Sequence, residues 1–455
     1  MRTTNRRRVG FASATLATVA LVAAACSPDV GGNGDDDTGE DDAAGDATDD
    51  GTDEGTGDDA DLSGETVTLR YWDELATEAY EASFAELEAQ TGITVELEQV
   101  PWGDYWDRLP LDLSSGTMAD IFWTNTSNFQ TYVTSGSLLE IDEALTDHDD
   151  WVQGVEDLYT YEGTLYGVPQ FWDALGLFYN VELVEAAGVD VENLRWDPAG
   201  PGEVGPEDTL LEAAEALTGD GVYGFNSQAD LQAIYLNFLA QNGAQWQDED
   251  YNFAFASEEG VQTFQYLVDL INEHEVAPSA ADTNLDGDLP QSLFLREELA
   301  LFQTGNYRLR NIADNAEFEW ALAPIVEGPE GRIGVVNGIS AVANADTENE
   351  EAVIEVLRWL GTAEGQAPLG DQGSFFPAVL DAQQAYLEYW EEQGVDIQAF
   401  LDAAEGESTP PPAGPNVQAA NNEITPLLQD MFLGNDDVAT MLERAQDAGN
   451  AEIGN

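Results

Sequence analysis

The chain has 455 residues and a formal charge of −77, with 90 acidic residues against 13 basic ones, all of them arginine. Such a charge repels other polyanions, so nucleic acids and anionic membrane surfaces are poor partners. The length exceeds what one hydrophobic core ordinarily organises, so two lobes are expected. Molar salt shortens the Debye length to about 3 Å and would screen this charge, which indicates an exported protein of a halophile.

The first predicted element is an export signal over residues 1–25. Arg6, Arg7 and Arg8 precede an apolar stretch that runs to Ala25, directly before Cys26. The stretch consists mainly of Ala, Thr, Ser and Val, which favours a cleaved segment over a spanning helix. Small residues before the cysteine suit a peptidase, so Cys26 is predicted to carry a lipid, with an ordinary thiol as the alternative. The general and the twin-arginine export routes both fit.

Residues 26–64 are predicted to contain the lipidated cysteine and an acidic disordered tether. Fifteen acids lie between Asp29 and Asp61, with almost no apolar residue among them. Such a segment repels itself and cannot bury a core. Cys26 is the only cysteine, so no intramolecular disulfide is possible.

From residue 65 the pattern is that of an α/β protein. Strands are predicted at 66–72, 93–100 and 120–123, with helices between them, which indicates a parallel sheet covered on both faces. Longer helices follow and predict a more helical second lobe; they are expected at 210–217, 231–241, 258–273 and 350–360.

Two late strands, 298–302 and 334–342, look like sheet members, so the chain is expected to cross between the lobes more than once and form a hinge. The expected division places 65–170 and about 290–340 in lobe 1, and about 171–289 and 341–455 in lobe 2. The positions of the crossovers stay open at this point.

Three patterns resemble chemical sites without completing them. Gly200–Gly205 matches a dinucleotide fingerprint in letters, but no strand precedes it and a proline interrupts it. Asp282–Asp288 fits the first half of a calcium loop, but Leu293 stands where a bidentate Glu is required. His148 and His274 have no plausible serine partner. No cofactor, metal or catalysed reaction is therefore expected, although calcium at Asp282–Asp288 stays open.

Four segments, in order, resemble the extracellular solute-binding proteins of ABC importers, in the carbohydrate-binding group called family 1. They are Ala119–Asn125 running on to Gly136–Asp142, Tyr166–Pro169 with Leu177–Asn180 and Ala187–Val189, Gln241–Ala244 followed by Val268–Leu270, and Ala300–Tyr307. The resemblance spans residues 65 to about 432. One departure is Gly305-Asn306-Tyr307, where Gly-Ser-Trp is common, and it leaves the sugar undetermined.

The resemblance implies a two-lobed fold of the periplasmic-binding-protein type II kind, in which each lobe is a mixed sheet flanked by helices and a multi-crossover hinge joins the lobes. It also implies a monomeric sugar receptor at the extracellular face of the membrane, with two permease subunits and a cytoplasmic ATPase dimer as partners. Lobe closure over the ligand would tell the importer that the receptor is loaded.

A sugar offers apolar ring faces and a rim of hydroxyls, so its site needs aromatic side chains beside polar ones. Loops at the carboxyl ends of strands are where an open α/β sheet binds ligands. The candidate ligand-binding residues are Trp72, Asp73, Trp102, Tyr105, Trp123, Asn125, Asn128, Trp172, Asp173, Trp246, Tyr307, Arg308 and Phe375.

Each candidate has an ordinary structural alternative. The aromatics could belong to the core, Asp73 and Asn125 could cap helices, and Arg308 could form an ion pair. Five other tryptophans lie in regular patterns and are expected to pack; they are Trp106, Trp151, Trp320, Trp359 and Trp390. Two rival functions remain open, which are a receptor of the same fold for a polyamine or other cation and a secreted polysaccharide hydrolase or lyase.

Overall fold

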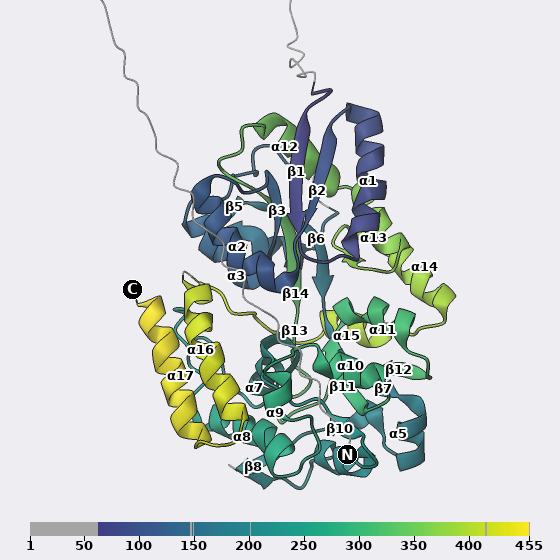
Figure 1. Cartoon of the computed structure of the whole chain (residues 1–455), viewed down its shortest axis with the longest axis vertical. Coiled ribbons are helices and arrows are strands. Elements are labelled where there is room, and N and C mark those ends of the chain that lie inside the picture. Colours follow the sequence, from purple (N-terminus) through teal and green to yellow (C-terminus); the bar gives the residue numbers. More distant parts are fainter. Residues whose placement is uncertain (1–61, 146–147, 149, 201, 415, 455) are drawn as a thin grey trace, which may run out of the picture. The chain divides into compact units, whose positions relative to one another are not determined.

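The computed structural model describes residues 62–145, 148, 150–200, 202–414 and 416–454 (Figure 1). The predicted export signal, Cys26 and nearly all of the predicted tether lie outside these residues. No helix in the described part of the chain is both long and apolar enough to cross a membrane. The contacts within residues 60–455 make them one unit, which is built on two larger sheets.

The first sheet has six strands in the order β15-β6-β14-β3-β1-β2. β1 pairs in parallel with β2 and β3, whereas β14 runs antiparallel to both β3 and β6. The strands are β1 (Thr66–Tyr71), β2 (Thr94–Gln99), β3 (Ile121–Asn125), β6 (Gly167–Asp173), β14 (Asn337–Ala343) and β15 (Phe376–Pro377).

Helices cover both faces of this sheet because its central strands are apolar on both sides. In β3, Ile121 and Trp123 point into one core cluster while Phe122 points into another, as alternation along a strand requires. The first cluster includes side chains of α1 (Ala76–Thr91), α12 (Glu350–Leu360) and α13 (Ala363–Asp371); the second includes those of α2 (Trp102–Ser115), α3 (Thr126–Thr134) and α14 (Gln383–Gln393).

The second sheet has four strands in the order β10-β11-β7-β12. They are β7 (Leu175–Asn180), β10 (Tyr223–Phe225), β11 (Leu299–Gly305) and β12 (Trp320–Ala323). Around this sheet lie α5 (Val181–Ala187), α6 (Leu210–Leu217), α7 (Leu236–Gln241), α8 (Glu258–Asn272), α9 (Ala280–Thr283), α10 (Leu289–Leu295), α11 (Leu309–Asn315), α15 (Gln398–Glu405), α16 (Val417–Phe432) and α17 (Val438–Ile453).

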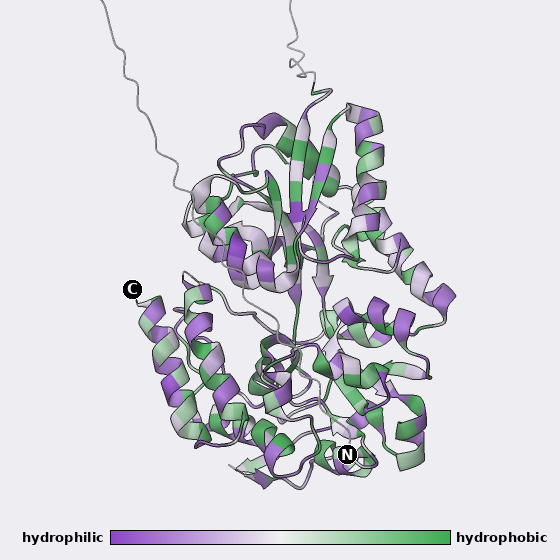
Figure 2. Cartoon of the chain, in the orientation of Figure 1, coloured by the Kyte–Doolittle hydropathy of each residue, from purple (hydrophilic) through white to green (hydrophobic). Residues whose placement is uncertain are grey.

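The C-terminal helices α16 and α17 lie side by side (Figure 1). Their ribbons carry both hydrophilic and hydrophobic residues (Figure 2), which is the composition of helices with one buried face. The buried residues Ile424, Leu428 and Leu442 belong to the same core cluster as Phe264 and Leu267 of α8. This packing joins the C-terminal pair to the body of the second sheet.

Short elements complete the chain. They are α4 (Gln153–Glu156), β4 (Thr160–Tyr161), β5 (Thr164–Leu165), β8 (Pro198–Gly200), β9 (Glu203–Val204), β13 (Gly334–Val335), β16 (Ser408–Thr409), the 3₁₀ turns Asp157–Tyr159, Val191–Asn193, Asn306–Arg308 and Leu380–Ala382, and a π-helical turn at Leu231–Tyr235. β8 and β9 form a hairpin, so Gly200–Gly205 does not lie between a strand and a helix as a dinucleotide fingerprint would.

The chain passes between the two sheets three times. β6 leads into β7 through Ala174, and β13 leads into β14 at the second passage. The third lies between α14 and α15, since Phe400 of α15 packs against Phe178 of β7 at 5.8 Å between ring centroids. A multi-crossover connection was predicted from the late strands, and the structure has one.

The sheets divide the chain differently from the predicted lobes. β11, expected in lobe 1, lies in the four-stranded sheet against β7, and α12 and α13, expected in lobe 2, cover the six-stranded sheet. The predicted strand 334–342 also splits into β13 and β14, which belong to different sheets. The reason is that pairing between strands more than a hundred residues apart leaves no periodic signal in the sequence.

Candidate functional site

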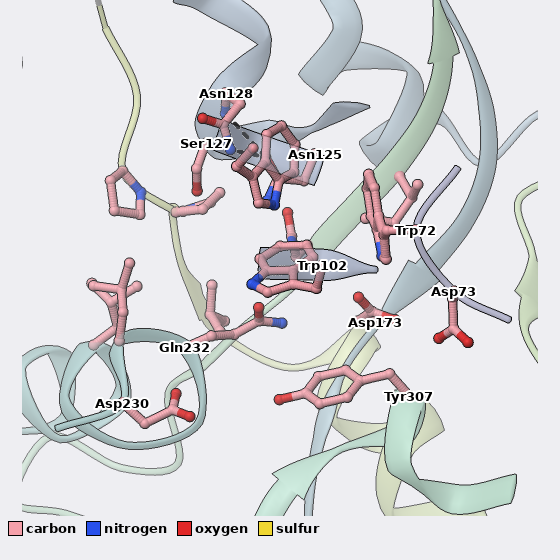
Figure 3. A pocket seen from close by; sticks show the side chains of 18 of the residues that line it. Trp72, Asp73, Trp102, Asn125, Ser127, Asn128, Asp173, Asp230, Gln232 and Tyr307 are labelled. Carbon is pink, nitrogen blue, oxygen red and sulfur yellow. Dashed lines mark hydrogen bonds between the residues drawn. The ribbon is translucent and has the colours of Figure 1, made fainter. Parts of the chain in front are cut away.

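A cavity of about 670 Å³ lies between the loops of the two sheets. Its wall includes residues directly after β1 and β3 and the last residue of β6, at the carboxyl ends of strands, where open α/β sheets bind ligands. Residues of the second sheet's side close it from the other direction, and Figure 3 shows side chains from both sides pointing into the same space. The two prolines Pro411 and Pro412 also line it.

Three tryptophans form one side of the cavity. Trp72 follows β1, and its ring centroid lies 5.3 Å from that of Trp102 and 5.4 Å from that of Trp106, at the start of α2. Trp102 is 52% exposed although it is a large apolar side chain. Rings held in this way present faces that can stack on the C–H surface of a sugar.

Other aromatic side chains line the cavity at separate points. Phe171 of β6 and Phe375 form a pair, with 4.3 Å between ring centroids. Tyr307 comes from the turn after β11, on the side of the second sheet, and burial raises the pKa of its phenol. The cavity therefore offers aromatic surface from both sheets.

Asn125 and Asn128 both line the cavity, and they also form the first turn of α3. The side-chain oxygen of Asn125 accepts hydrogen bonds from the backbone N–H of Asn128 at 3.1 Å and from its amide nitrogen at 2.8 Å. Asn125 is thus the helix cap that the sequence left open as an alternative. The capping bonds fix both amides at the edge of the cavity.

Two aspartates, Asp73 and Asp173, lie close together in the wall (Figure 3). Asp73 accepts a hydrogen bond from the backbone N–H of Leu75 at 3.0 Å. Asp173 ends β6 and is 7% exposed. Burial, and secondarily the neighbouring charge of Asp73, raise the pKa of Asp173 to about 7. Burial also raises the pKa of Asp73, although the Leu75 N–H and Arg308 oppose this shift.

Arg308 lines the cavity but is already engaged. Its guanidinium forms an ion pair with Asp288 and lies 5.7 Å from the centre of the Tyr307 ring. The ion pair is the structural alternative that the sequence left open. Arg308 therefore contacts both Asp288 and Tyr307 in the cavity wall. Only part of its hydrogen-bonding capacity is free for a ligand.

Further polar residues complete the wall and were missed in the sequence. Asn337 begins β14 of the first sheet, and the others, Asp230, Gln232, Gln418 and Asn421, come from the second sheet's side. Asp230 caps the π-helical turn by accepting from Ala233 N–H at 2.8 Å. Amides scattered over almost two hundred residues carry no spacing signal; only Asp230, an acid before an apolar run, could have been flagged as a cap.

Four buried polar atoms on the wall have no hydrogen-bond partner within the described residues. Two are donors, Trp106 Nε1 and Gln232 Nε2, and two are acceptors, Asn337 Oδ1 and Gln418 Oε1. Buried polar groups are normally paired, so unpaired ones around a cavity indicate a partner that enters it. The mixture of donors and acceptors matches the hydroxyl group, which is both.

Four of the predicted ligand-binding side chains do not line the cavity, because they pack in the core. Tyr105 lies behind Trp72 and donates to the carbonyl of Trp123 at 2.6 Å, and Trp123 is fully buried. Trp172 packs against Phe376 at 4.4 Å between ring centroids. Trp246, also buried, is the fourth.

Trp246 stacks on Phe255 with 4.4 Å between ring centroids, in the core beneath the second sheet. Trp106, in contrast, was expected to pack and instead lines the cavity. Tyr105 and Trp106 are neighbours on α2, and neighbouring residues of a helix point in different directions. The sequence alone does not show which face of the helix is covered by the core.

The remaining patterns form no site within the described residues. No group of three or more His, Cys, Asp or Glu side chains there is arranged to hold a metal ion. Asp282 lies in α9 and Asp288 pairs with Arg308, so the calcium-like segment is occupied by other contacts. His148 and His274 approach Glu156 and Glu215, at 3.2 and 3.8 Å.

Comparison with known proteins gives a family and a fold. A family model described as "Bacterial extracellular solute-binding protein" matches residues 66–367. The crystal structure of UspC from M. tuberculosis is 39% identical, with a TM-score of 0.69, over 85% of this chain and all of that one.

Two further matches are more distant. The substrate-binding protein Lmo0181 from Listeria monocytogenes, solved in complex with cycloalternan, has a TM-score of 0.76 and 21% identity over 86% of this chain and 99% of that one. An arabinooligosaccharide-binding protein of Halalkalibacterium halodurans is 27% identical over 192 residues, which are 41% of this chain and 40% of that protein.

Proposed function

Because the chain belongs to the family of bacterial extracellular solute-binding proteins, we propose that it is the receptor of an ABC importer and binds a sugar or oligosaccharide in the cavity between its two sheets. One observation carries the proposal. A single cavity combines the aromatic faces of Trp72, Trp102 and Tyr307 with unpaired buried donors and acceptors. Sugars are the solutes that need both kinds of surface at once.

The relatives support a carbohydrate ligand. One similar protein is named for binding arabinooligosaccharides, and another was solved with cycloalternan. The family consists of binding proteins, and we propose that this chain likewise catalyses no reaction. The sugar and its linkage are left to experiment, since the wall residues Gln232, Asn337 and Gln418 would decide which hydroxyls are accepted.

We propose that binding closes the two sheets toward each other by bending at the three passages. A ligand stabilises the closed form only if it contacts both sides, and the cavity offers Trp72 and Trp102 from one side and Tyr307 and Gln232 from the other. Asp173 and Asn337 stand at two of the passages, which places polar ligand contacts at the points that would bend.

The first part of the chain belongs to the proposal as well. Residues 1–25 would direct export, Cys26 would carry the lipid and residues 26–64 would tether the receptor to the extracellular face of the membrane. The monomeric receptor would deliver its ligand to two permease subunits driven by an ATPase dimer. The acidic composition, with a formal charge of −77, supports operation at high salt.

The test is a binding screen of the purified chain at high salt, followed by tryptophan fluorescence and calorimetry against mono-, di- and oligosaccharides. A saturable response to one sugar group is expected, and Trp102→Ala should weaken it at least about tenfold. Leu285→Ala is the matched control, because Leu285 is 88% exposed and lies outside the cavity wall. Silence across the sugars, or release of sugar from a polymer, would contradict the proposal.

A further inference from the structure

Asp173 lines the cavity, and the described part of the protein supplies no hydrogen-bond donor for its carboxylate. Its side chain is 7% exposed, and its carboxylate receives no hydrogen bond from any described residue. A carboxylate without donors from the protein depends on the water of the cavity for its hydrogen bonds. A ligand that displaces this water must therefore supply the donors itself.

General acidity does not explain this carboxylate, because a halophilic composition places acids on the surface. Among the described residues, two carboxylates are buried, those of Asp173 and Asp208. Asp208 accepts from the backbone N–H groups of Asp197 at 2.9 Å and Leu211 at 2.8 Å. The protein satisfies one buried aspartate fully and leaves the other, on the cavity wall, without a donor.

The surroundings of Asp173 add acceptors and no available cation. Asn337, its partner in the register between β14 and β6, is 6% exposed and its Oδ1 is also unpaired. Asp73 and Asp230 contribute two further carboxylates to the wall. Among the described residues of the wall, the one cationic side chain is Arg308, and it is held by Asp288. The missing partner is thus a donor that also carries positive charge.

Aromatic rings lie on either side of this position. Figure 3 shows Asp73 and Asp173 in the space between Trp72 and Tyr307. A cation near ring faces is attracted by their electrons, and more strongly where water is excluded. Carboxylates and aromatic faces together are the surroundings that a protonated amine finds favourable, while a neutral hydroxyl gains less from the charges.

We propose that the ligand is a sugar bearing a protonated amino group, and that this ammonium is bound by Asp173 with Asp73 and Asn337 as further acceptors. The inference rests on the proposed function and makes the ligand class more specific. An ammonium would favour the ionised form of Asp173, whose pKa in the empty site is raised by burial and by Asp73.

Other charged or titratable groups around Asp173 do not substitute for the ammonium. Tyr159, Tyr307 and Tyr386 interact with its charge but are themselves neutral, because burial raises the pKa of each phenol. Arg308 acts on Asp73. The negative charge at this point of the cavity is therefore opposed by no free cation of the described protein.

The test compares matched sugars by calorimetry on the full-length chain at high salt. The probes are glucosamine, galactosamine and the chitosan disaccharide, each beside its neutral parent and its N-acetylated form, with spermidine as a cation that is not a sugar. The amino form is expected to bind at least about tenfold more tightly than both matched forms. The preference should persist as salt rises, because a buried pair is screened less than an exposed one.

Variants assign the preference to Asp173. Asp173→Asn should remove most of the tenfold difference between the amino form and its neutral parent. Asp381→Asn, an exposed aspartate outside the wall, should change neither value. If Asp173→Asn fails to fold, Asp73→Asn should reduce the preference in the same direction.

The outcomes separate the two proposals. Neutral sugars that bind as tightly as their amino forms, or a preference that survives Asp173→Asn, would overturn the amino-sugar inference and leave the sugar receptor intact. Binding of spermidine with no response to any sugar would overturn the proposed function itself.

Discussion

The empty receptor should be destabilised by its own ligand site above neutral pH, and Asp173→Asn should relieve this. The pKa of Asp173 is about 7 in the folded chain against an ordinary value of 3.8. An acid whose folded pKa is raised binds more protons in the folded state, so the free energy of unfolding falls as pH rises from about 4 to about 7. The loss is complete above that window and absent below it.

The size of the effect follows from the same two values. A difference of about three pH units corresponds to about 4 kcal/mol, an upper bound because the side chain borders a cavity that admits water. Asp173→Asn keeps the shape of the side chain and removes the charge. We expect the variant to gain about 2–4 kcal/mol in free energy of unfolding at pH 8.5, and about 1 kcal/mol or less at pH 4.5.

The assay is urea denaturation of wild type and variant at constant high salt across this pH range. Asp208→Asn serves as the matched control, because Asp208 is equally buried but holds two backbone N–H groups. Loss of an acceptor there should destabilise the chain by about 1–3 kcal/mol. A stabilisation by Asp173→Asn that does not grow with pH, or a destabilisation at pH 8.5, would refute the reasoning.

Three further predictions follow from the packing. Trp102→Ala should lower sugar affinity at least about tenfold in calorimetry while changing the free energy of unfolding by less than about 0.5 kcal/mol, because Trp102 is half exposed. Trp246→Ala should instead cost about 3–5 kcal/mol of stability in urea denaturation, since this ring is buried on Phe255, and should act on affinity only through unfolding. Asn337→Ala, which removes an unpaired acceptor from the wall, should reduce sugar affinity several-fold in calorimetry without loss of stability.

The sequence predicted the α/β class and much of the first sheet because these depend on local patterns. The alternation in β1 and the short apolar run of β3 can be read without knowledge of distant partners. The family resemblance supplied the two-lobed architecture. The sequence could not predict which sheet contains β11 and which contains β14. This depends on which strands pair across more than a hundred residues.

The residues of the cavity wall were predicted best at the carboxyl ends of strands. Trp72, Asp73 and Asp173 line the cavity as expected, because carboxyl ends of neighbouring strands meet at one edge of a sheet. Trp123 and Trp172 lie within strands of the same sheet. Their rings pack in the core clusters that cover its faces and do not line the cavity. The side of the wall that carries Gln232 could not be found, because only the folded chain brings it near the first sheet.

The central claim is that a sugar binds in this cavity and is held from both sheets. A crystal structure of the protein grown with the tightest-binding sugar of the screen tests it most directly. We expect a sugar ring against Trp72 or Trp102, with polar contacts to Asp173 from one side and to Gln232 or Tyr307 from the other. A sugar bound elsewhere on the chain, or held by one sheet alone, would contradict it.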